Sequence, residues 1–421
     1  MNIALFSDSY LPTKSGIVTV VIQLRRILMQ MGHHVVVVTV SPDTQEDAPP
    51  EGTEDEGILR LPSLPSPVGD NQYIGLPLEG KAVAFCEEHH IQLIHAHTEF
   101  TMGHLARVTG RKLGIPVIAT THTMWEDYYR YYIKMGKIVP KSVIRRLVHT
   151  AYKHFYALIN VSQKAHDYFK NPFILPSSPS AVIPNAIDTE RFMGRTANDE
   201  DIRGLRRLFG ISDSEPVILY VGRIVEEKRV KELFEVCLKV VTERPDVKVL
   251  FVGDGAALPE LVERAKETGT DKRILFAGFV DWFHLAAYYA IGTIFVTASL
   301  SEMHSMTVLE AMAMSLPIAC RRDTSFTDTV FPGENGYLAD TDEELAQRLC
   351  ELAADPARCR EMGKRSTELC RNFTLGIHGA RTIAFYEAVL AQFPRPITDA
   401  MLESAVEKAG ADFRDIQGRG I

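Results

Sequence analysis

The sequence has 421 residues, of which 46% are hydrophobic and 24% are charged, and these values are typical of a soluble globular protein of about two domains. The net charge of −8 argues against a nucleic-acid-binding protein, and no apolar run reaches the roughly 18 residues that suggest a membrane-spanning helix. The first residues lack the basic and apolar regions of a signal peptide, and the six cysteines form no Cys-x-x-Cys pair, so we expect reduced thiols in the cytosol.

Short apolar strand patterns alternate with helix patterns through the first half of the chain. The strand patterns cover residues 3–7, 34–40, 93–97, 117–121 and 158–161, and the first helix pattern covers residues 17–31. Short apolar strands separated by helices predict a parallel sheet with crossover helices. Residues 42–70 are rich in proline, glycine and acids and predict a long surface connection.

Gly16 lies between the first strand pattern and the first helix pattern. A glycine at this place lets the backbone approach a phosphate without a side-chain clash. It could equally be an ordinary turn glycine, and both interpretations stay open. No Gly-x-Gly-x-x-Gly follows the strand, which weakens the case for a dinucleotide site.

Three histidines mark the ends of later strand patterns. His95 and His97 alternate with Glu99, so on a strand these side chains would share one face. Imidazoles suit zinc, but a buried polar turn is the favoured interpretation, and we enter no metal site. His122 follows the strand pattern 117–121, where a catalytic role is weighed against a structural one.

Residues 125–146 combine aromatic and basic side chains in a way that suits a membrane interface. The candidates for contact with the membrane or an acceptor are Trp125, Tyr128, Tyr129, Tyr132, Lys137, Lys141, Arg145 and Arg146. Residues 101–170 hold 12 Lys and Arg against three acids, which indicates an anionic partner surface.

A helix pattern follows Pro140 and is amphipathic. At 100° per residue its apolar face would hold Ile144, Leu147, Val148, Ala151 and Phe155, and another face would hold Arg145, Arg146, His149 and Lys153. Such a helix can lie on anionic lipid, or it can pack on its own domain with a solvated basic face. The pattern alone leaves both alternatives open.

A proline-rich stretch at 171–188 predicts a domain boundary, and a second alternation follows it. Strand patterns cover residues 217–221, 247–252, 274–277 and 293–297, and helix patterns cover 342–354 and 356–371. The chain therefore predicts two doubly wound halves with a ligand cleft between them.

Arg223 and Lys228 follow the first strand pattern of the second half. Two cations at the carboxyl end of a strand could neutralise a diphosphate leaving group, although lone basic residues in loops are usually just solvated.

Glu302 and Glu310 lie in the run Ser-Leu-Ser-Glu-Met-His-Ser-Met-Thr-Val-Leu-Glu at 299–310. A helix pattern begins near Ser305, and its first backbone N–H groups could hold a diphosphate. Glu310, one turn further on, could accept hydrogen bonds from a ribose diol, and Glu302 could meet the hydroxyls of an attached sugar. The alternative is a strand–loop–helix unit with two solvated glutamates.

These segments together resemble retaining glycosyltransferases of the GT-B class, in glycosyltransferase family 4. The matching motifs are Glu302-x7-Glu310, Gly222-Arg223 with Glu227-Lys228, 251–255 (Phe-Val-Gly-Asp-Gly) and 276–280 (Phe-Ala-Gly-Phe-Val). The resemblance implies an α/β fold of GT-B type, with two Rossmann-like, doubly wound domains facing across a cleft. We expect an acceptor and membrane-facing domain at 1–185, a nucleotide-sugar domain at 186–376, and a C-terminal helix and tail at 377–421 that cross back to the first domain.

The resemblance also implies roles for individual residues. The donor UDP-sugar would meet Gly16, Arg223, Lys228, Val280, Glu302, Ser305, Met306, Thr307 and Glu310. His122, Glu302 and Asp127 would face the reacting centre. Members of this class need no obligatory metal, and the UDP-sugar is a co-substrate, so we expect no cofactor.

The run Thr-His-Thr-Met-Trp-Glu-Asp-Tyr at 121–128 is similar to a segment of the bacterial diacylglycerol glucosyltransferases within this family. It implies transfer of a hexose from a UDP-sugar to a membrane lipid, with diacylglycerol as the expected acceptor. We expect a cytoplasmic protein, peripheral on the anionic inner face of the cell membrane, that binds no nucleic acid. Glucose is the favoured hexose, but His304 and Ser305 depart from many relatives near the expected place of the donor sugar, so galactose stays open.

Three alternatives remain at this point. The same fold could act on a soluble sugar, a sugar phosphate or a small precursor of a thiol. The chain could instead be a non-catalytic UDP-sugar-binding protein at the membrane, although such a protein would not need His122. A nucleotide-sugar epimerase would release product without any acceptor.

Overall fold

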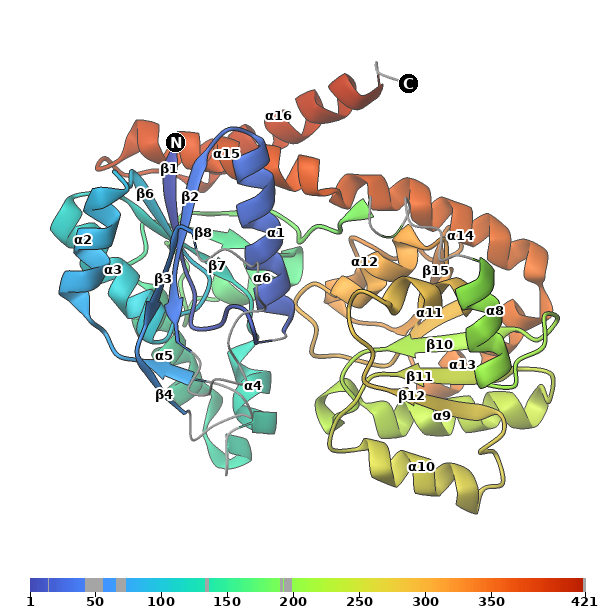
Figure 1. Ribbon diagram of the computed structural model, residues 1–421. Helices are drawn as coiled ribbons and strands as arrows, with labels where there is room; N and C mark the ends of the chain where they lie inside the picture. The colour runs from blue at the N-terminus through green and yellow to red at the C-terminus, as the bar shows by residue number, and fades with distance from the viewer. Residues whose placement is uncertain are drawn as a thin grey trace. The chain divides into compact units, whose positions relative to one another are not determined.

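The computed structural model describes residues 1–13, 15–41, 56–65, 73–132, 136–189, 192 and 199–418 (Figure 1). The chain divides into two compact units. Unit 1 contains Met1–Ala186 together with Leu375–Ile421, and unit 2 contains Ile187–Thr374. The chain therefore leaves unit 1 once and returns to it at its C-terminal end.

Unit 1 is built on a parallel sheet in the order β3-β2-β1-β6-β7-β8-β9. Its strands are β1 (Asn2–Phe6), β2 (His34–Val40), β3 (Ile58–Leu61), β6 (Leu93–Ala96), β7 (Val117–Thr121), β8 (Ala157–Asn160) and β9 (Ser180–Val182). A separate antiparallel pair joins β4 (Ser63–Pro65) and β5 (Tyr73–Gly75). Its helices are α1 (Gly16–Gln30), α2 (Glu79–Glu88), α3 (Thr101–Leu113), α4 (Trp125–Tyr132), η2 (Gly136–Ile138), α5 (Lys141–Tyr152), α6 (Gln163–Phe169), α15 (Leu375–Gln392) and α16 (Asp399–Gly418).

The sheet of unit 1 is apolar on both faces because helices cover both. Ile3 and Leu5 of β1 pack in one cluster with residues of α1 and α15, whereas Ala4 and Phe6 point to the opposite face and are equally buried. Four consecutive valines make β2 a buried strand that pairs in parallel register with β1.

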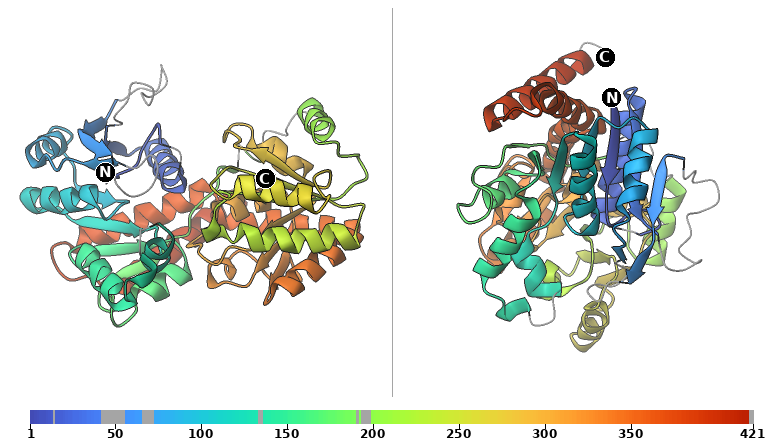
Figure 2. Two further views of the ribbon diagram at one scale, coloured as in Figure 1. Left: turned by 90° about the horizontal axis from the view of Figure 1, so that it is seen from below. Right: turned by 90° about the vertical axis from the view of Figure 1, so that its left-hand side faces the viewer.

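The C-terminal helices complete this core, and the red helices of Figures 1 and 2 lie beside the N-terminal sheet. Phe385, Tyr386 and Val389 of α15 and Leu402 of α16 are fully buried in the same cluster as Ile3. A segment that follows unit 2 in the sequence is thus part of the core of unit 1.

Unit 2 is a second parallel sheet, in the order β12-β11-β10-β13-β14-β15. Its strands are β10 (Val217–Val221), β11 (Lys248–Val252), β12 (Ile274–Gly278), β13 (Ile294–Thr297), β14 (Ile318–Arg321) and β15 (Gly336–Ala339). Its helices are α8 (Asp199–Leu208), η3 (Glu226–Lys228), α9 (Val230–Glu243), α10 (Leu258–Glu267), α11 (Leu285–Ile291), α12 (Met306–Ala313), η4 (Thr324–Phe326), α13 (Asp342–Ala354), α14 (Pro356–Cys370) and η5 (Arg371–Phe373). Alternate residues of β10 enter two different clusters, one with α9, α10 and α13 and the other with α11 and α12, so this sheet is also covered on both faces.

The predicted fold class is confirmed, with two Rossmann-like parallel sheets. The strand patterns at 34–40, 117–121 and 217–221 coincide with β2, β7 and β10. The prediction of a surface connection over 42–70 was wrong in part, because β3 adds an edge strand there by pairing with β2. Residues 42–55 and 66–70 lie outside the described residues.

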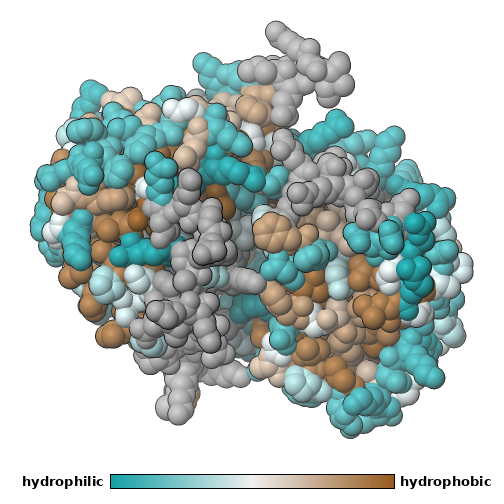
Figure 3. Space-filling model, viewed as in Figure 1, coloured by the Kyte–Doolittle hydropathy of each residue, from teal (hydrophilic) through white to brown (hydrophobic). Residues whose placement is uncertain are grey.

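Three further findings concern the cysteines, the helices and the surface. All six cysteines are free, and five of them are buried. Among the helices of the described ranges, none combines the length and the apolar character needed to cross a bilayer. On the face seen in Figure 3, hydrophilic and hydrophobic residues are interspersed over both units.

Candidate active site

The loops after β10 and β13 form a candidate site within unit 2. These strands are neighbours in parallel register, so their carboxyl ends lie at the same edge of the sheet. The first loop carries Arg223 and Lys228, and the second carries Glu302. The residues predicted from separate motifs therefore meet.

Ion pairs join these loops. Lys228 Nζ donates to Glu302 Oε1 at 2.8 Å, and Arg223 Nη2 donates to Glu227 Oε2 at 3.0 Å. Ser301 Oγ donates to the other oxygen of Glu227 at 3.0 Å. Glu227, which the sequence showed only as a neighbour of Lys228, thus makes a second link between the two loops.

Glu302 is held as a carboxylate. Burial alone would raise its pKa, but Lys228, Ser299 and Arg223 together outweigh burial and lower the pKa below the ordinary value. An ionised carboxylate only accepts hydrogen bonds, and sugar hydroxyls donate them. Lys228 has three N–H donors, so it can keep Glu302 and still contact a phosphate oxygen.

Glycine lets the strand ends approach closely at the same edge. Gly253, just after β11, has φ 139°, and a Cβ built there would lie 1.9 Å from the carbonyl oxygen of Gly222. Any side chain would therefore push the Arg223 loop away from its place. Val280 follows β12 at this edge and packs, partly buried, against the core of the unit.

Helix α12 begins where it was predicted. Ser305 is its N-cap, and its hydroxyl accepts from Val308 N at 3.4 Å. Met306 and Thr307 are the first helical residues and are partly exposed, and their N–H groups have no partner within the helix. The positive end of the helix dipole thus follows Glu302, the partner of Lys228, closely along the chain.

Glu310 is buried on α12 and has a partner that the sequence did not indicate. Tyr289 Oη donates to Glu310 Oε2 at 2.7 Å, and the Tyr289 side chain is fully buried on α11. Burial, together with the Glu310 charge, raises the pKa of Tyr289 well above its ordinary value, so the phenol keeps its proton. A fixed donor on one carboxylate oxygen orients the other for a ligand.

His304 is a second residue whose partner appears only in the structure. Its side chain is fully buried, with Nε2 at 3.6 Å from Asp328 Oδ2 and its ring 5.6 Å from that of Phe373. Burial lowers the pKa of His304 although Asp328 acts in the opposite direction. This pair holds the loop between Glu302 and Ser305 against the unit's own core.

A separate group of candidate residues lies in unit 1 and contains the histidines. His122 follows β7, and its Nε2 lies 3.1 Å from His97 Nδ1. The His97 ring lies 4.1 Å from the His95 ring. Burial, aided by the charge of His378, lowers the pKa of His122 to about 3, so this imidazole is neutral near pH 7.

His95 has both ring nitrogens in hydrogen bonds, 2.6 Å from Tyr386 Oη and 2.6 Å from Thr120 Oγ1. Within the described ranges, no three His, Cys, Asp or Glu side chains are arranged to hold a metal ion. The strand β6 ends at Ala96, so His97 and Glu99 lie in the turn that leads to α3, and the polar turn was the interpretation that the sequence favoured.

Two buried acids lie at this edge instead. Asp8 accepts from Thr98 Oγ1 at 2.6 Å and from Met102 N at 3.1 Å, so it caps the start of α3. Burial raises the pKa of Asp8 to about 6 against the effect of these donors. Burial likewise raises the pKa of Glu99 to about 7, and the donors of Tyr152 and Trp125 act in the opposite direction.

Trp125 of α4 lies differently from the prediction, whereas Tyr128 and Tyr129 are partly exposed. Trp125 is only 8% exposed, and its ring packs against Phe100, Tyr128 and Tyr129, so it is core rather than membrane-facing surface. Asp127 lies on the same helix and is partly exposed. The side chains of Tyr132 and Lys137 lie outside the described residues.

The structure divides the predicted apolar face of α5. Ile144 and Val148 are buried, but Leu147 is 47% exposed beside Val143, also 47% exposed. Leu147 follows Val143 by four residues, so both lie on the outer side of the helix.

The basic residues of α5 divide into two groups. Arg145 Nε donates to Glu126 Oε1 at 2.8 Å and Lys141 lies 3.0 Å from Glu126 Oε2, so both face α4. Arg146 is exposed on the side of Val143 and Leu147.

Gly16 is the first residue of α1 and is exposed, and Ser15 before it is the N-cap. A Cβ at Gly16 would meet nothing within 4 Å. The fold of unit 1 therefore does not itself require glycine at this place.

Comparison with known protein families finds two matches in this chain. Residues 14–191 match Glycosyltransferase Family 4, and residues 201–369 match Glycosyl transferases group 1.

Three individual proteins illustrate the similarity. The alpha-monoglucosyldiacylglycerol synthase of Acholeplasma laidlawii is 30% identical over 361 residues, which are 85% of this chain and 89% of that protein. The alpha-monoglucosyldiacylglycerol synthase of Streptococcus pneumoniae is 30% identical over 357 residues, 85% of this chain and 79% of its own. Among solved structures, Anabaena HepE in complex with UDP superimposes with a TM-score of 0.72 at 18% identity, covering 92% of this chain and 100% of that one.

Proposed function

This chain belongs to the glycosyltransferases of group 1 and family 4, and on that premise we propose that it transfers a hexose from a UDP-sugar to a membrane lipid with retention of configuration. Glucose is the first candidate for the hexose and diacylglycerol for the acceptor. The observation that best supports binding of the UDP-sugar donor is the ion pair of Lys228 with Glu302 at 2.8 Å beside the start of α12. The similarity to two alpha-monoglucosyldiacylglycerol synthases supports the acceptor.

The donor would be held by charge and by backbone N–H groups together. Arg223 and Lys228 would bind the diphosphate, and the N–H groups of Met306 and Thr307 would add the dipole of α12. Glu310 would accept from the ribose, and Val280 would lie beside the base as it does in the resembling family. No metal ion is part of this proposal.

As the bond from sugar to phosphate breaks, negative charge develops on the leaving diphosphate, and these cations and dipoles are already in place to stabilise it. Glu302 would hold the hydroxyls of the transferred sugar. His122 is neutral, so its proposed task is a hydrogen bond to the reacting sugar rather than transfer of an ionic proton.

The proposed membrane surface is the outer side of α5 with the preceding turn, and we call it the α5 surface. It consists of Ile138, Val143, Arg146 and Leu147, of which Ile138 is 72% exposed. Apolar side chains next to a cation suit an anionic lipid interface, where each cation adds about 1 kcal/mol. We place the protein as a peripheral protein on the cytoplasmic face of the cell membrane.

The test of the reaction is incubation of the purified protein with labelled UDP-glucose or UDP-galactose and diacylglycerol in anionic mixed micelles. We expect label in the lipid phase with one donor, and an α-linked product by NMR. UDP release without lipid label would assign a soluble acceptor or hydrolysis instead. Intact donor under every condition would favour the non-catalytic alternative.

The test of the α5 surface is sedimentation with anionic liposomes. We expect Arg146→Glu and Leu147→Ser each to weaken binding several-fold. Arg207→Glu and Leu208→Ser are matched controls, because α8 of unit 2 carries the same pair of residues with Leu208 72% exposed. Equal effects in both helices would reject the α5 surface.

A further inference from the structure

We infer that His97 is a positioning residue that fixes the orientation and the tautomer of His122. Its effect on turnover rests on the proposed function, whereas its effect on the tautomer does not. The inference starts from the hydrogen bond between His97 Nδ1 and His122 Nε2, 3.1 Å long, and from the stacking of the two rings at 5.4 Å and 23°.

The chemistry of two neutral imidazoles makes this bond selective. Burial lowers the pKa of both His97 and His122, so each ring has one N–H and one lone pair. If His97 Nδ1 donates, His122 must carry its proton on Nδ1. If His122 Nε2 donates, His97 must carry its proton on Nε2. In either case both rings have the same tautomer, and His122 Nδ1 is set as a donor or as an acceptor accordingly.

His97 is itself held in place from behind. The His95 ring lies 4.1 Å from it, and His95 is fixed by hydrogen bonds of 2.6 Å to Tyr386 and to Thr120. Tyr386 is fully buried on α15. A helix from the C-terminal end of the chain therefore anchors the histidines that precede His122.

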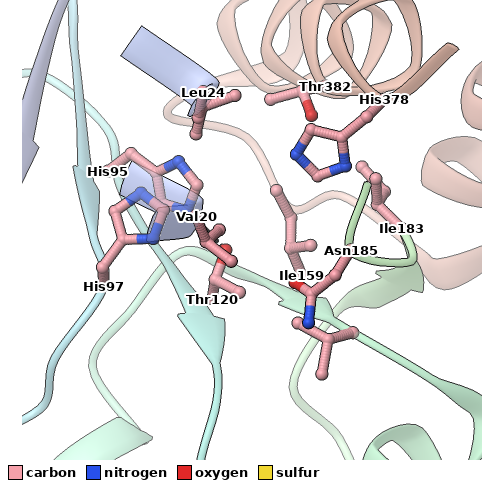
Figure 4. A pocket seen from close by; sticks show the side chains of 11 residues that line it. Val20, Leu24, His95, His97, Thr120, Ile159, Ile183, Asn185, His378 and Thr382 are labelled. Carbon is pink, nitrogen blue, oxygen red and sulfur yellow. Dashed lines mark hydrogen bonds between the residues drawn. The ribbon is translucent and has the colours of Figure 1, made fainter. Parts of the chain in front are cut away.

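His97 lines a small cavity whose surface is mostly apolar. Figure 4 shows His95 and His97 on one side of this cavity and His378 and Thr382, both from α15, on the other. Within the described part of the chain, His97 Nε2 and Thr382 Oγ1 are buried without a hydrogen-bond partner. The cavity has about 10 Å³, roughly the space of one water molecule.

A water in this cavity would accept from His97 Nε2–H or donate to its lone pair, depending on the tautomer. The tautomers of His97 and His122 are matched. Polar groups that line the cavity and favour one tautomer of His97 therefore favour the same tautomer of His122. Thr382, on α15, lines this cavity, and its buried hydroxyl has no other hydrogen-bond partner among the described residues.

The test is ¹⁵N NMR of the full chain labelled in its histidine rings, with His97→Asn and His122→Gln used to assign the two signals. At pH 7 we expect His97 and His122 to be neutral and to show the same tautomer. The asparagine amide can take the place of Nδ1 as either donor or acceptor, so His97→Asn should leave His122 as a mixture of tautomers. Opposite tautomers in the two rings, or an unchanged His122 signal in His97→Asn, would overturn the inference.

Two variants that keep both histidines distinguish an effect of the cavity from a general effect of losing a buried hydroxyl. Thr382→Val removes the hydroxyl at the cavity, and Thr109→Val removes a buried hydroxyl that also lacks a partner but lies on α3. We expect the His97 signal to shift in the first and not in the second. Equal shifts in both would assign the effect to core packing and contradict a role for the cavity.

Turnover supplies a second readout. In His97→Asn we expect kcat to fall by about 10- to 100-fold, the usual range for an outer partner of a functional histidine, while the Kd for UDP changes less than twofold. A loss confined to UDP affinity would contradict the inference. If the wild-type protein transfers no sugar, the proposed function fails, and the NMR result alone decides the role of His97.

Discussion

At the scale of single residues, the clearest arrangement is the carboxylate of Glu310 with the phenol of Tyr289. The carboxylate is 5% exposed and accepts one hydrogen bond of 2.7 Å from a fully buried donor. A hydrogen bond to a charged group contributes about 1.5–3 kcal/mol, so this pair sets how well Glu310 can serve a ribose.

We therefore expect Glu310→Ala to weaken UDP binding by about 10- to 100-fold, the fold-change that such a hydrogen bond represents. Tyr289→Phe should weaken UDP binding less, because the Glu310 carboxylate remains and loses only the hydrogen bond that orients it. Isothermal titration calorimetry with UDP measures both, and Tyr337→Phe on β15 is the control. Unchanged UDP affinity in Glu310→Ala would remove the ribose assignment.

Glu99 gives a prediction about pH. Its pKa is raised from 4.5 to about 7 because burial disfavours the charged form. Between these two values the folded protein keeps a proton that the unfolded chain has released, so stability falls as the pH rises from 4.5 through 7. Above pH 7 the buried carboxylate is ionised, and the loss is complete.

Glu99→Gln has no such proton to lose. We therefore expect the difference in Tm between Glu99→Gln and the wild type to increase, in favour of the variant, by at least about 3 °C from pH 4 to pH 8. This is the shift in Tm that 1 kcal/mol gives in a domain of this size. Thermal unfolding followed by circular dichroism at several pH values checks this, with Glu88→Gln, an exposed residue of α2, as the control. Parallel wild-type and Glu99→Gln curves would contradict the raised pKa.

At the scale of elements, helix α12 shows how local sequence positions a binding group. Ser305 caps the helix through Val308 N, and the apolar residues that follow bury it against the unit's core. The cap sets where the first N–H groups point, so it affects both stability and the proposed diphosphate site.

Ser305→Ala should lower the stability of unit 2 by about 1 kcal/mol, and Ser305→Gly by only a few tenths. Thr341→Ala is a matched control, because Thr341 caps α13 of the same unit through Glu344 N at 3.0 Å. Urea unfolding should show similar losses for the two alanine variants, while UDP affinity should fall only in Ser305→Ala. A loss of UDP affinity in both would mean that the cap acts through general stability alone.

The α5 helix shows the limit of periodicity as a guide. Its pattern placed Leu147 with Ile144 and Val148, whereas the structure places Leu147 outside with Val143. The apolar face of α5 is wider than the surface with which the helix packs on its domain. The neighbouring elements decide which apolar residues of that face are buried and which remain exposed.

At the scale of the whole molecule, the two units differ in how the chain builds them. Unit 2 is one continuous segment, Ile187–Thr374, whereas unit 1 needs two segments that are far apart in sequence. Ile187 and Thr374 form an isolated β-bridge, so the chain enters and leaves unit 2 at neighbouring points.

We therefore expect residues 187–374 to fold alone and residues 1–186 alone not to fold. Without α15 and α16, the sheet face that carries Ile3 and Leu5 would lose the apolar side chains of Phe385 and Leu402 that pack in the same cluster and would become exposed to water. Replacing residues 187–374 by a short Gly-Ser linker should restore a folded unit 1, because the two points that it joins are close. Circular dichroism and thermal melting check all three proteins. Cooperative unfolding of residues 1–186 alone would contradict this dependence on the C-terminal helices.

Much of the candidate site could be predicted because its residues lie within short motifs. Arg223, Lys228, Glu302 and Glu310 each follow a strand or lie on a helix that local patterns identify, and parallel strands bring such positions to one edge. Tyr289 and Asp328 could not be found in this way, because each meets its partner only after helices separated in sequence have packed. Glu227 was within reach, since it stands beside Lys228 in a motif already identified.

The sequence by itself determined most of the central strands and their helices, the parallel class of both sheets and the charged residues at their edges. These follow from local information: apolar runs that form buried strands, caps that start helices, and charged residues at strand ends. The tertiary structure decided which charges are paired, which aromatic rings are buried and which histidine nitrogens meet. These depend on distances between residues up to 291 positions apart, as for His95 and Tyr386, and no local pattern fixes such distances.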